Sequence, residues 1–185
     1  NDMQNDIVTI ASVGDSRGIL CCNKNGSYVT MSKDHKPDDP LEKERIETNG
    51  GYIEKRGVWR VNGKLAISRS FGDIELKEKK LLNAIPSIRS TVCKKQQTDL
   101  YNSRHDDDDH GVECLFIILG TDGVWDVISN EEAIAVVKLS LKQYGPNSNN
   151  MNRHIFSQNA SSALTHEVYV RDSRDNIGVM IIAMW

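Results

Sequence analysis

The chain has 185 residues, a length typical of one domain or of a large part of one. It contains 23 Lys and Arg residues against 26 Asp and Glu residues, so its formal net charge is −3. A balance so close to neutrality argues against nucleic acid or an anionic membrane as a partner. The two most apolar runs, residues 114–119 and 177–185, reach only about half of a membrane span and therefore predict buried strands.

The four cysteines, Cys21, Cys22, Cys93 and Cys114, contain no Cys-x-x-Cys pair, which argues against a zinc site. Cys21 and Cys22 are adjacent in a strand-like run, so their side chains face opposite sides. We interpret the four as buried structural thiols in a reducing compartment. No basic-then-apolar leader opens the chain, and we expect an intracellular protein, cytoplasmic or nuclear.

The N-terminal part has the pattern of short β-strands. Residues 7–13 and 17–22 predict a hairpin around the turn signal Gly14-Asp15, and residues 27–31 continue a meander after the turn Asn25-Gly26. A helix is then predicted over residues 41–48. Asp39 is suited to cap its start, and the glycines at positions 50 and 51 are suited to end it.

The middle of the chain is less regular. Residues 52–70 predict short β segments with a tight turn at Asn62-Gly63. Residues 74–111 are polar and predict a solvated insertion, with one strand at residues 85–92. The acidic run at residues 106–109 lacks the glycine and the ligand spacing of an EF-hand loop, which argues against a calcium site.

The C-terminal part predicts a buried strand at residues 114–120, two helices and a closing strand at residues 177–185. Ser129 and Glu132 form a capping-box pattern, and the second helix is predicted over residues 153–168. The apolar positions at helical spacing are Ile134, Val137, Leu141, Phe156, Ala160, Ala163, Leu164 and Val168. The order of elements predicts an α+β fold with a mostly antiparallel sheet.

Acidic residues follow or precede these strands. Asp122 comes just after the strand at residues 114–120, and Asp175 comes just before the last strand. If the two strands are antiparallel neighbours, both carboxylates lie at one edge of the sheet, where Asp15 and Asp126 could join them. Converging carboxylates need a cation, and their hard oxygens favour magnesium or manganese. The alternative is that each is an ordinary turn aspartate.

Six sequence blocks in this order resemble one known family, the metal-dependent serine/threonine protein phosphatases of type 2C. The resemblance runs from about residue 7 to residue 184. The blocks are Val13-Gly-Asp-Ser-Arg17; Lys33-Asp-His-Lys-Pro37; Glu44-Arg-Ile46 with Gly50-Gly51; Arg60-Val-Asn-Gly-Lys-Leu-Ala-Ile-Ser-Arg-Ser-Phe-Gly-Asp73; Ile117-Ile-Leu-Gly-Thr-Asp-Gly-Val-Trp-Asp126; and Ser173-Arg-Asp-Asn176.

The resemblance implies a four-layer αββα fold, in which an antiparallel β-sandwich is flanked by helices on both sides. Residues 1–185 would be a partial catalytic domain that lacks its N-terminal part, and residues 74–111 would be the family's variable, flap-like insertion. The implied reaction is the hydrolysis of phosphoserine and phosphothreonine in proteins. A water bridging two manganese or magnesium ions would attack the phosphorus directly, so no side chain is catalytic and no phospho-enzyme forms. The complete domain would hold two or three such ions.

The resemblance also implies roles for single residues. Asp122 and Asp175 match metal-bound aspartates, and Asp15 and Asp126 match aspartates of a further, weaker metal site. Asp73 closes its sequence block, and the resemblance implies a structural or flap-positioning role for it rather than a metal-binding one. From the residues themselves we expect Asn176 to hold the turn of Asp175 by its amide and Arg69 to be an ion-pair partner. We expect His35, in a loop block, to make structural hydrogen bonds.

The chain departs from the family at two points. It contains no Asp-Gly-His-Gly-Gly block, which in the family binds both core metals, and Gly178 replaces the usual Thr or Ser. We therefore expect these residues alone to be inactive, and a catalytically inactive pseudophosphatase or binding module is the alternative function. A haloacid-dehalogenase-like phosphatase is excluded because Gly120 stands where its nucleophilic aspartate would be. The expected partners are phosphorylated proteins, with no nucleic acid and no membrane.

Overall fold

The computed structural model of the chain describes residues 6–22, 27–94 and 112–185. These residues divide into two compact units. The sheet unit comprises the described parts of Asn1–Ile10, Arg17–Met31 and Arg89–Trp185, and the hairpin unit comprises Ala11–Ser16 and Ser32–Ile88.

The sheet unit is built around strand β7 (Val112–Gly120). The strands β2 (Arg17–Cys22) and β8 (Val179–Ala183) each pair with β7 in antiparallel fashion, and β3 (Ser27–Thr30) extends the sheet beyond β2. The start of β7 also pairs, in parallel, with the end of β6 (Ser87–Lys94), whose other neighbour is β1 (Asp6–Ser12). The predicted antiparallel pairing of the last strand with residues 114–120 is confirmed.

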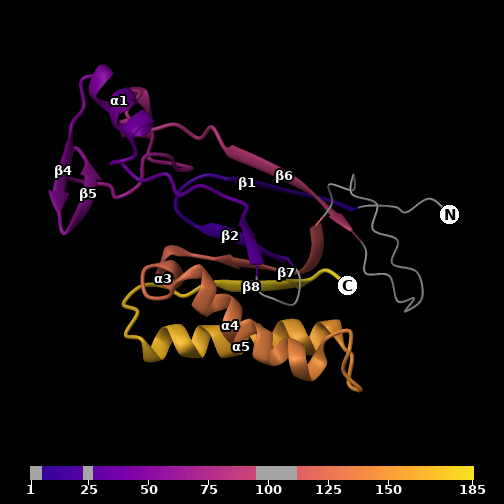
Figure 1. Cartoon of the computed structure of the whole chain (residues 1–185). Coiled ribbons are helices and arrows are strands. Elements are labelled where there is room, and N and C mark those ends of the chain that lie inside the picture. The colour runs from indigo at the N-terminus through magenta and orange to yellow at the C-terminus, as the bar shows by residue number, and fades with distance from the viewer. Residues whose placement is uncertain (1–5, 23–26, 95–111) are drawn as a thin grey trace. The chain divides into compact units, whose positions relative to one another are not determined.

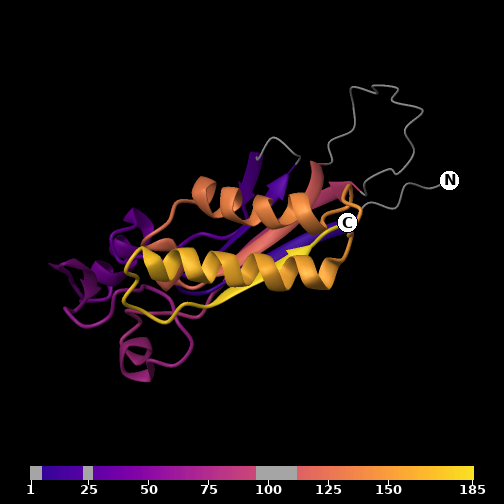
Figure 2. The same ribbon diagram turned by 90° about the horizontal axis from the view of Figure 1, so that it is seen from below.

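Two helices cover one face of this sheet. The helices α4 (Asn130–Tyr144) and α5 (Arg153–Val170) run side by side along β7 and β8 (Figures 1 and 2). The predicted capping box is present, because the Ser129 hydroxyl accepts from the Glu132 N–H and the Glu132 carboxylate accepts from the Ser129 N–H. The core between the helices and the sheet includes the buried residues Ile19, Cys21, Phe116, Ile118, Ile134, Val137, Phe156, Ala160, Leu164, Val168 and Ile181.

The predicted apolar face of the second helix is wrong for one residue. Ala163 is exposed, whereas Ala160 and Leu164 are fully buried. The buried residues of α5 follow a strict step of four from Phe156, and Ala163 points about 100° away from Leu164 around the helix axis.

The other face of the central sheet is also covered. Successive side chains of a strand point to opposite sides, so Leu20 and Ile117 lie away from the helices. There they pack with Cys22, Cys93, Cys114 and Met31, and with Val8 and Ile10 of β1. Burial on both faces explains why residues 114–120 are continuously apolar rather than alternating.

The α+β fold predicted from the sequence is confirmed. Within the described residues of the sheet unit there are three layers: β1 with β6, the central sheet, and α4 with α5 (Figure 1). The helices of this unit lie on one side only, so this part of the chain represents three of the four layers that the resemblance implies. In the described part of the chain, no helix is long and apolar enough to cross a membrane.

The predicted hairpin between residues 7–13 and 17–22 is wrong. β1 pairs with β6, and the neighbours of β2 are β3 and β7. The residues between β1 and β2 do not close a tight turn, because the Gly14 carbonyl accepts from the His35 N–H at 2.9 Å and Asp15 pairs with Lys36. The pairing of β2 with β3 is confirmed, whereas the turn Asn25-Gly26 lies outside the described residues.

The hairpin unit contains α1 (Pro40–Thr48), the hairpin of β4 (Ile53–Arg56) with β5 (Val58–Val61), and the short helix α2 (Ile74–Glu78). Asp39 caps α1 as predicted, since its carboxylate accepts from the N–H groups of Leu41 and Glu42. The tight turn expected after β5 is also present, with both Asn62 and Gly63 at positive φ.

The interpretation of residues 74–111 as solvated throughout is wrong for its first part. Leu76, Leu81 and Leu82 are buried against Ile46 and Val61. Four charged residues separate Leu76 from the adjacent pair Leu81-Leu82, so the segment gives no periodic apolar signal. The predicted strand at residues 85–92 corresponds to β6, and the acidic run lies outside the described residues.

The interpretation of all four cysteines as thiols is also wrong. Cys93 of β6 and Cys114 of β7 form a disulfide, whereas Cys21 and Cys22 are free and buried. The long interval between Cys93 and Cys114 contains no local signal that their strands are neighbours. Only the parallel pairing of β6 with β7 brings the two together.

A buried carboxylate holds the hairpin unit together. Glu42 of α1 is 2% exposed and accepts from Arg69 Nε at 3.0 Å and from Arg45 Nη2 at 2.9 Å. The two guanidinium groups donate in turn to backbone carbonyls, Arg69 to Ile85 and Arg45 to Leu81 and Ser68. Burial raises the pKa of Glu42, but the hydrogen bonds from Arg69 and Arg45 outweigh it and lower the pKa to about 2.

We predict that Glu42→Gln lowers the free energy of unfolding by about 3 kcal/mol, because it removes the buried countercharge of two partly exposed guanidinium groups. Denaturant unfolding at neutral pH, followed by circular dichroism, measures this loss. Glu44→Gln is the matched control, since Glu44 is exposed on the same helix and should change stability by less than about 0.5 kcal/mol.

The difference in the free energy of unfolding between the wild type and Glu42→Gln should depend on pH. The folded-state pKa of Glu42 lies below its ordinary value of 4.5, so the charged carboxylate contributes its full stabilisation above pH 4.5. The contribution is lost as the pH falls through the folded-state pKa of about 2. A stability difference that stays constant over this interval would contradict the assignment.

Candidate metal centre

The two principal aspartates lie at one edge of the central sheet, as the sequence predicted. β7 ends at Gly120, which is paired with Val179 at the start of β8. The next residue, Thr121, continues the contact: its N–H donates to the Gly178 carbonyl at 3.0 Å, and its hydroxyl accepts from the Gly178 N–H at 3.0 Å. Asp122 and Asp175 therefore lie on loops that leave the same end of the same strand pair.

The loops that carry the two aspartates touch directly. A Cβ atom added to Gly123 would lie 2.5 Å from the Asn176 carbonyl oxygen, so only glycine allows this approach. The Ser173 hydroxyl donates to the Gly123 carbonyl at 2.6 Å, and the Thr121 hydroxyl donates to the Asn176 carbonyl at 2.9 Å. The residue that follows Asp122 is thus held against the residue that follows Asp175.

A tryptophan fixes the turn after β7. Asp122 begins the short helix α3 (Asp122–Trp125), and Trp125 folds back so that its indole N–H donates to the Gly120 carbonyl at 2.9 Å. The Arg17 guanidinium lies over the Trp125 ring, 5.2 Å from its centroid. These contacts bury Trp125 and set the direction in which the chain leaves the sheet.

Each aspartate is also held by its own loop. Asp122 Oδ1 accepts from the Gly123 N–H at 2.9 Å, and Asp175 Oδ1 accepts from the Asn176 N–H at 2.6 Å. Asp126 lies one helical turn after Asp122 and is exposed, as is Asp175. The contact between Asn176 and Asp175 comes from the Asn176 backbone, whereas the sequence predicted the side-chain amide.

Sequence reasoning missed Thr121, Ser173 and Trp125 as residues that shape this edge. Thr121 and Ser173 carry no signal of their own, because their partners are carbonyls that lie far away in the chain. Trp125 carried a usable signal, since a buried indole N–H needs an acceptor, which is the Gly120 carbonyl.

The chemistry of this edge fits a hard divalent cation. Two carboxylates on touching loops offer oxygen ligands, which magnesium and manganese prefer. In the described residues, however, no group of three or more His, Cys, Asp and Glu side chains is arranged to hold a metal ion. Among the described residues, this edge therefore offers two carboxylates on touching loops and no larger group of ligands.

The remaining predicted site residues belong to the hairpin unit. Lys36 pairs with the Asp15 carboxylate, and the buried His35 ring holds the same loop through the Gly14 carbonyl at 2.9 Å. The second ring nitrogen of His35 lies 2.8 Å from the Ser87 hydroxyl. Burial, together with the nearby Arg69, lowers the pKa of His35, so the ring is neutral. These contacts agree with a structural role for His35.

Arg69 and Asp73 also have partners within the hairpin unit. Arg69 forms the ion pair with Glu42 described above, which agrees with the expectation that it is an ion-pair partner. Asp73 accepts from the Ser70 hydroxyl at 2.6 Å and adopts a left-handed backbone conformation, with φ at 50°. Both residues thus shape the segment of residues 69–73.

Comparison with known sequences points to one protein family. A family model described as "Protein phosphatase 2C" matches residues 2–177. A rice protein (Oryza sativa subsp. japonica) named "Probable protein phosphatase 2C 45" is 38% identical over 178 residues, which are 96% of this chain and 50% of that protein. The bovine (Bos taurus) "Protein phosphatase 1L" is 35% identical over 175 residues, 95% of this chain and 40% of that protein.

Solved structures with a similar fold include the following two. A phosphatase from Toxoplasma gondii aligns with a TM-score of 0.71 at 26% identity, covering 96% of this chain and 48% of that chain. The structure of a C. elegans sex determining protein has the same fold, with a TM-score of 0.72 at 22% identity and coverage of 98% of this chain and 38% of that one. The chain thus spans about half the length of the curated relatives that it matches.

We predict that Thr121→Val lowers the free energy of unfolding by about 1 to 3 kcal/mol, because the Gly178 N–H and the Asn176 carbonyl both lose their partner. The substitution preserves shape, so packing should not change. Thr48→Val, at an exposed position at the end of α1, is the control and should have little effect. Equal denaturation midpoints for the two variants would contradict the role given to Thr121.

Proposed function

Because the chain belongs to the protein phosphatase 2C family, we propose that it forms part of the catalytic domain of an enzyme that hydrolyses phosphoserine and phosphothreonine in proteins. The observation that carries this proposal is the contact between the Asp122 and Asp175 loops at the shared end of β7 and β8. A fold that brings two carboxylates together in this way concentrates negative charge where a cation can neutralise it.

The proposed cofactor is manganese or magnesium, with two or three ions in the complete domain. Asp122 and Asp175 would be ligands of the core ions, and Asp126 and Asp15 would serve a further ion. When bound, such ions supply hydroxide at neutral pH and stabilise the charge that develops on the transferred phosphoryl group. The ions of the complete domain need further ligands beyond these residues, since the chain contains no Asp-Gly-His-Gly-Gly block.

The residues around Asp122 and Asp175 would keep the two carboxylates in place before any ion binds. Thr121, Gly123 and Ser173 join the two loops through backbone contacts, and these do not depend on the side chains of the aspartates. Rigid positioning of ligands limits the reorganisation that binding requires. The contacts support Asn176 as a supporting residue, because its carbonyl accepts from Thr121 and its N–H donates to Asp175.

The hairpin unit would contribute positioning rather than chemistry. The Asp15 carboxylate already pairs with the Lys36 ammonium, which would repel a second cation, so ion binding there is expected to be weak. Arg69, Glu42 and Asp73 would hold the segment that leads into residues 74–111, which we propose as the family's variable flap-like insertion. The substrates would be phosphorylated proteins.

An inactive pseudophosphatase or binding module is the second candidate. It would apply if the longer protein lacked the Asp-Gly-His-Gly-Gly block, which supplies core metal ligands in the family and does not occur in these 185 residues. The two candidates differ in whether the longer protein binds manganese and turns over a phosphopeptide.

We predict that Asp122→Asn in the full-length protein lowers turnover of a phosphothreonine peptide by about 10²-fold or more, because one interaction with the charged transition state is lost. It should also weaken manganese binding, measured by calorimetry, by about tenfold or more. Asp172→Asn removes the same charge from an exposed residue whose partner is the exposed Arg174, and it should change neither quantity.

Wild-type turnover and wild-type manganese affinity in a folded Asp122→Asn variant would overturn the site assignment. A folded wild-type protein that binds manganese and still hydrolyses no phosphopeptide would favour the pseudophosphatase instead.

We further predict that the 185-residue chain alone shows no manganese-stimulated hydrolysis of the same peptide. Two or three carboxylates bind a divalent ion weakly, since affinity depends on the number and charge of the ligands and on the rigidity of the site. A longer chain that includes the upstream part of the domain should be active. Manganese-dependent turnover by the 185 residues alone would mean that other residues among them complete the site.

A further inference from the structure

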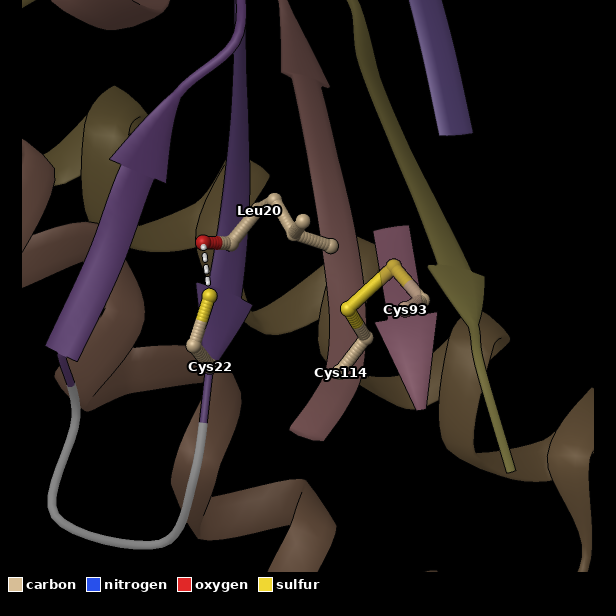
Figure 3. The surroundings of a disulfide bond; sticks show 4 residues. All are labelled: Leu20, Cys22, Cys93 and Cys114. Carbon is tan, nitrogen blue, oxygen red and sulfur yellow. Dashed lines mark hydrogen bonds between the residues drawn. A yellow bond between two sulfur atoms is a disulfide. The ribbon is translucent and has the colours of Figure 1, made fainter. Parts of the chain in front are cut away.

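Three of the four cysteines meet in one buried cluster of the sheet unit. Cys22 of β2, Cys93 of β6 and Cys114 of β7 come from adjacent strands and share this cluster with Leu20, as Figure 3 shows. Each of the three is at most 3% exposed. Nothing in the proposed phosphatase chemistry uses these side chains, so the cluster calls for a separate explanation.

The disulfide adds a covalent link to the pairing of β6 with β7. Among the described residues, this parallel pairing comprises two residue pairs, Cys93 with Val112 and Lys94 with Glu113. The Cα atoms of Cys93 and Cys114 are 5.5 Å apart, in the middle of the range that a disulfide spans. The bond therefore joins β6 covalently to the central sheet at a pair of neighbouring strands.

The third cysteine lies on the other side of Cys114. Cys22 and Cys114 are register partners in the antiparallel pairing of β2 with β7. Partners of this kind point to the same face of a sheet, with Cβ atoms about 4.5 to 5.5 Å apart, so a small shift brings them within disulfide range. The register shifts between Cys21 and Cys22, and such an irregularity gives the backbone local freedom to make that adjustment.

We propose that Cys22, Cys93 and Cys114 form a thiol–disulfide exchange site, in which the bond to Cys114 passes between Cys93 and Cys22. The Cys22 thiolate attacks the Sγ atom of Cys114, a new Cys22–Cys114 bond forms, and the Cys93–Cys114 bond breaks. Cys93 leaves as a thiolate and takes up the proton that Cys22 gave up, so the exchange needs no oxidant or reductant.

The exchange moves a covalent link from one strand pair to another. In the first state the link joins β6 to β7, and in the second it joins β2 to β7, which leaves β6 held by its strand pairing and packing alone. Small dithiols are the external partners of this chemistry: they reduce either disulfide by the same attack, and their own sulfurs become the new disulfide.

Burial controls the rate of the exchange. It raises the pKa of the Cys22 thiol, so the thiolate is scarce, and the Cys22 Sγ–H group faces the Leu20 carbonyl at 3.6 Å. We therefore expect exchange within the folded protein to take minutes to hours, the slow end of the range for disulfide reshuffling.

The chain contains a matched control in Cys21. It is the direct neighbour of Cys22 and is fully buried, but it points to the opposite face, under α4 and α5. Burial raises the pKa of this thiol to about 11. If position in the sequence alone decided reactivity towards Cys114, Cys21 and Cys22 would react equally. If the shared face of the sheet decides it, Cys22 reacts and Cys21 does not.

The test traps the Cys22–Cys114 disulfide in the 185-residue chain. Cys93→Ser is incubated with oxidised dithiothreitol, quenched with acid, digested and analysed by mass spectrometry. We expect a cross-link between the peptide of residues 18–24 and the peptide that contains Cys114. Cys21 and Cys22 share that first peptide, so each is also replaced by serine in the Cys93→Ser background. The cross-link should persist without Cys21 and fall at least about tenfold without Cys22.

The wild type provides a second arm that needs no substitution. After incubation in a buffer of reduced and oxidised dithiothreitol, the acid-quenched protein should contain both the Cys93–Cys114 and the Cys22–Cys114 cross-links. If Cys93→Ser does not fold, as judged by circular dichroism, this arm alone decides. The proposal is overturned if Cys22 stays fully alkylatable throughout, or if Cys21 forms the cross-link as readily as Cys22.

Discussion

The antiparallel pairing of β7 with β8 is the constraint on which the candidate site depends. It makes the end of one strand meet the start of another that lies far along the chain, and the pairing continues through Thr121 and Gly178 into the loops themselves. A slip of one residue would turn every side chain of β8 to the opposite face and would move Asn176 away from Gly123. The place of Asp175 relative to Asp122 thus follows from strand register.

Burial of β7 on both faces secures that register. Phe116 and Ile118 pack under the helices α4 and α5, while Cys114 and Ile117 pack with β1 and β6. A shifted β7 would lose both sets of contacts at once. The hairpin unit depends on a different kind of interaction, the buried Glu42 carboxylate with Arg45 and Arg69, whose loss would leave charged groups without partners.

Local signals in the sequence predicted much of this. The capping box at Ser129, the cap at Asp39 and the apolar run of β7 were confirmed because each depends on neighbours in the chain. The convergence of Asp122 and Asp175 was predicted because it needs only one strand pairing. The partner of β1, the disulfide of Cys93 with Cys114 and the roles of Thr121 and Ser173 were not predicted, since each depends on a contact between distant segments.

We propose that Asp122 and Asp175 bind the same group of ions. The anomalous scattering of manganese in a crystal of the full-length domain reveals whether they do. We expect a manganese peak within about 2.0 to 2.3 Å of a carboxylate oxygen of each aspartate, the coordination distance of small divalent ions. Ordered manganese that contacts neither carboxylate, with the contact between Gly123 and Asn176 intact, would contradict it.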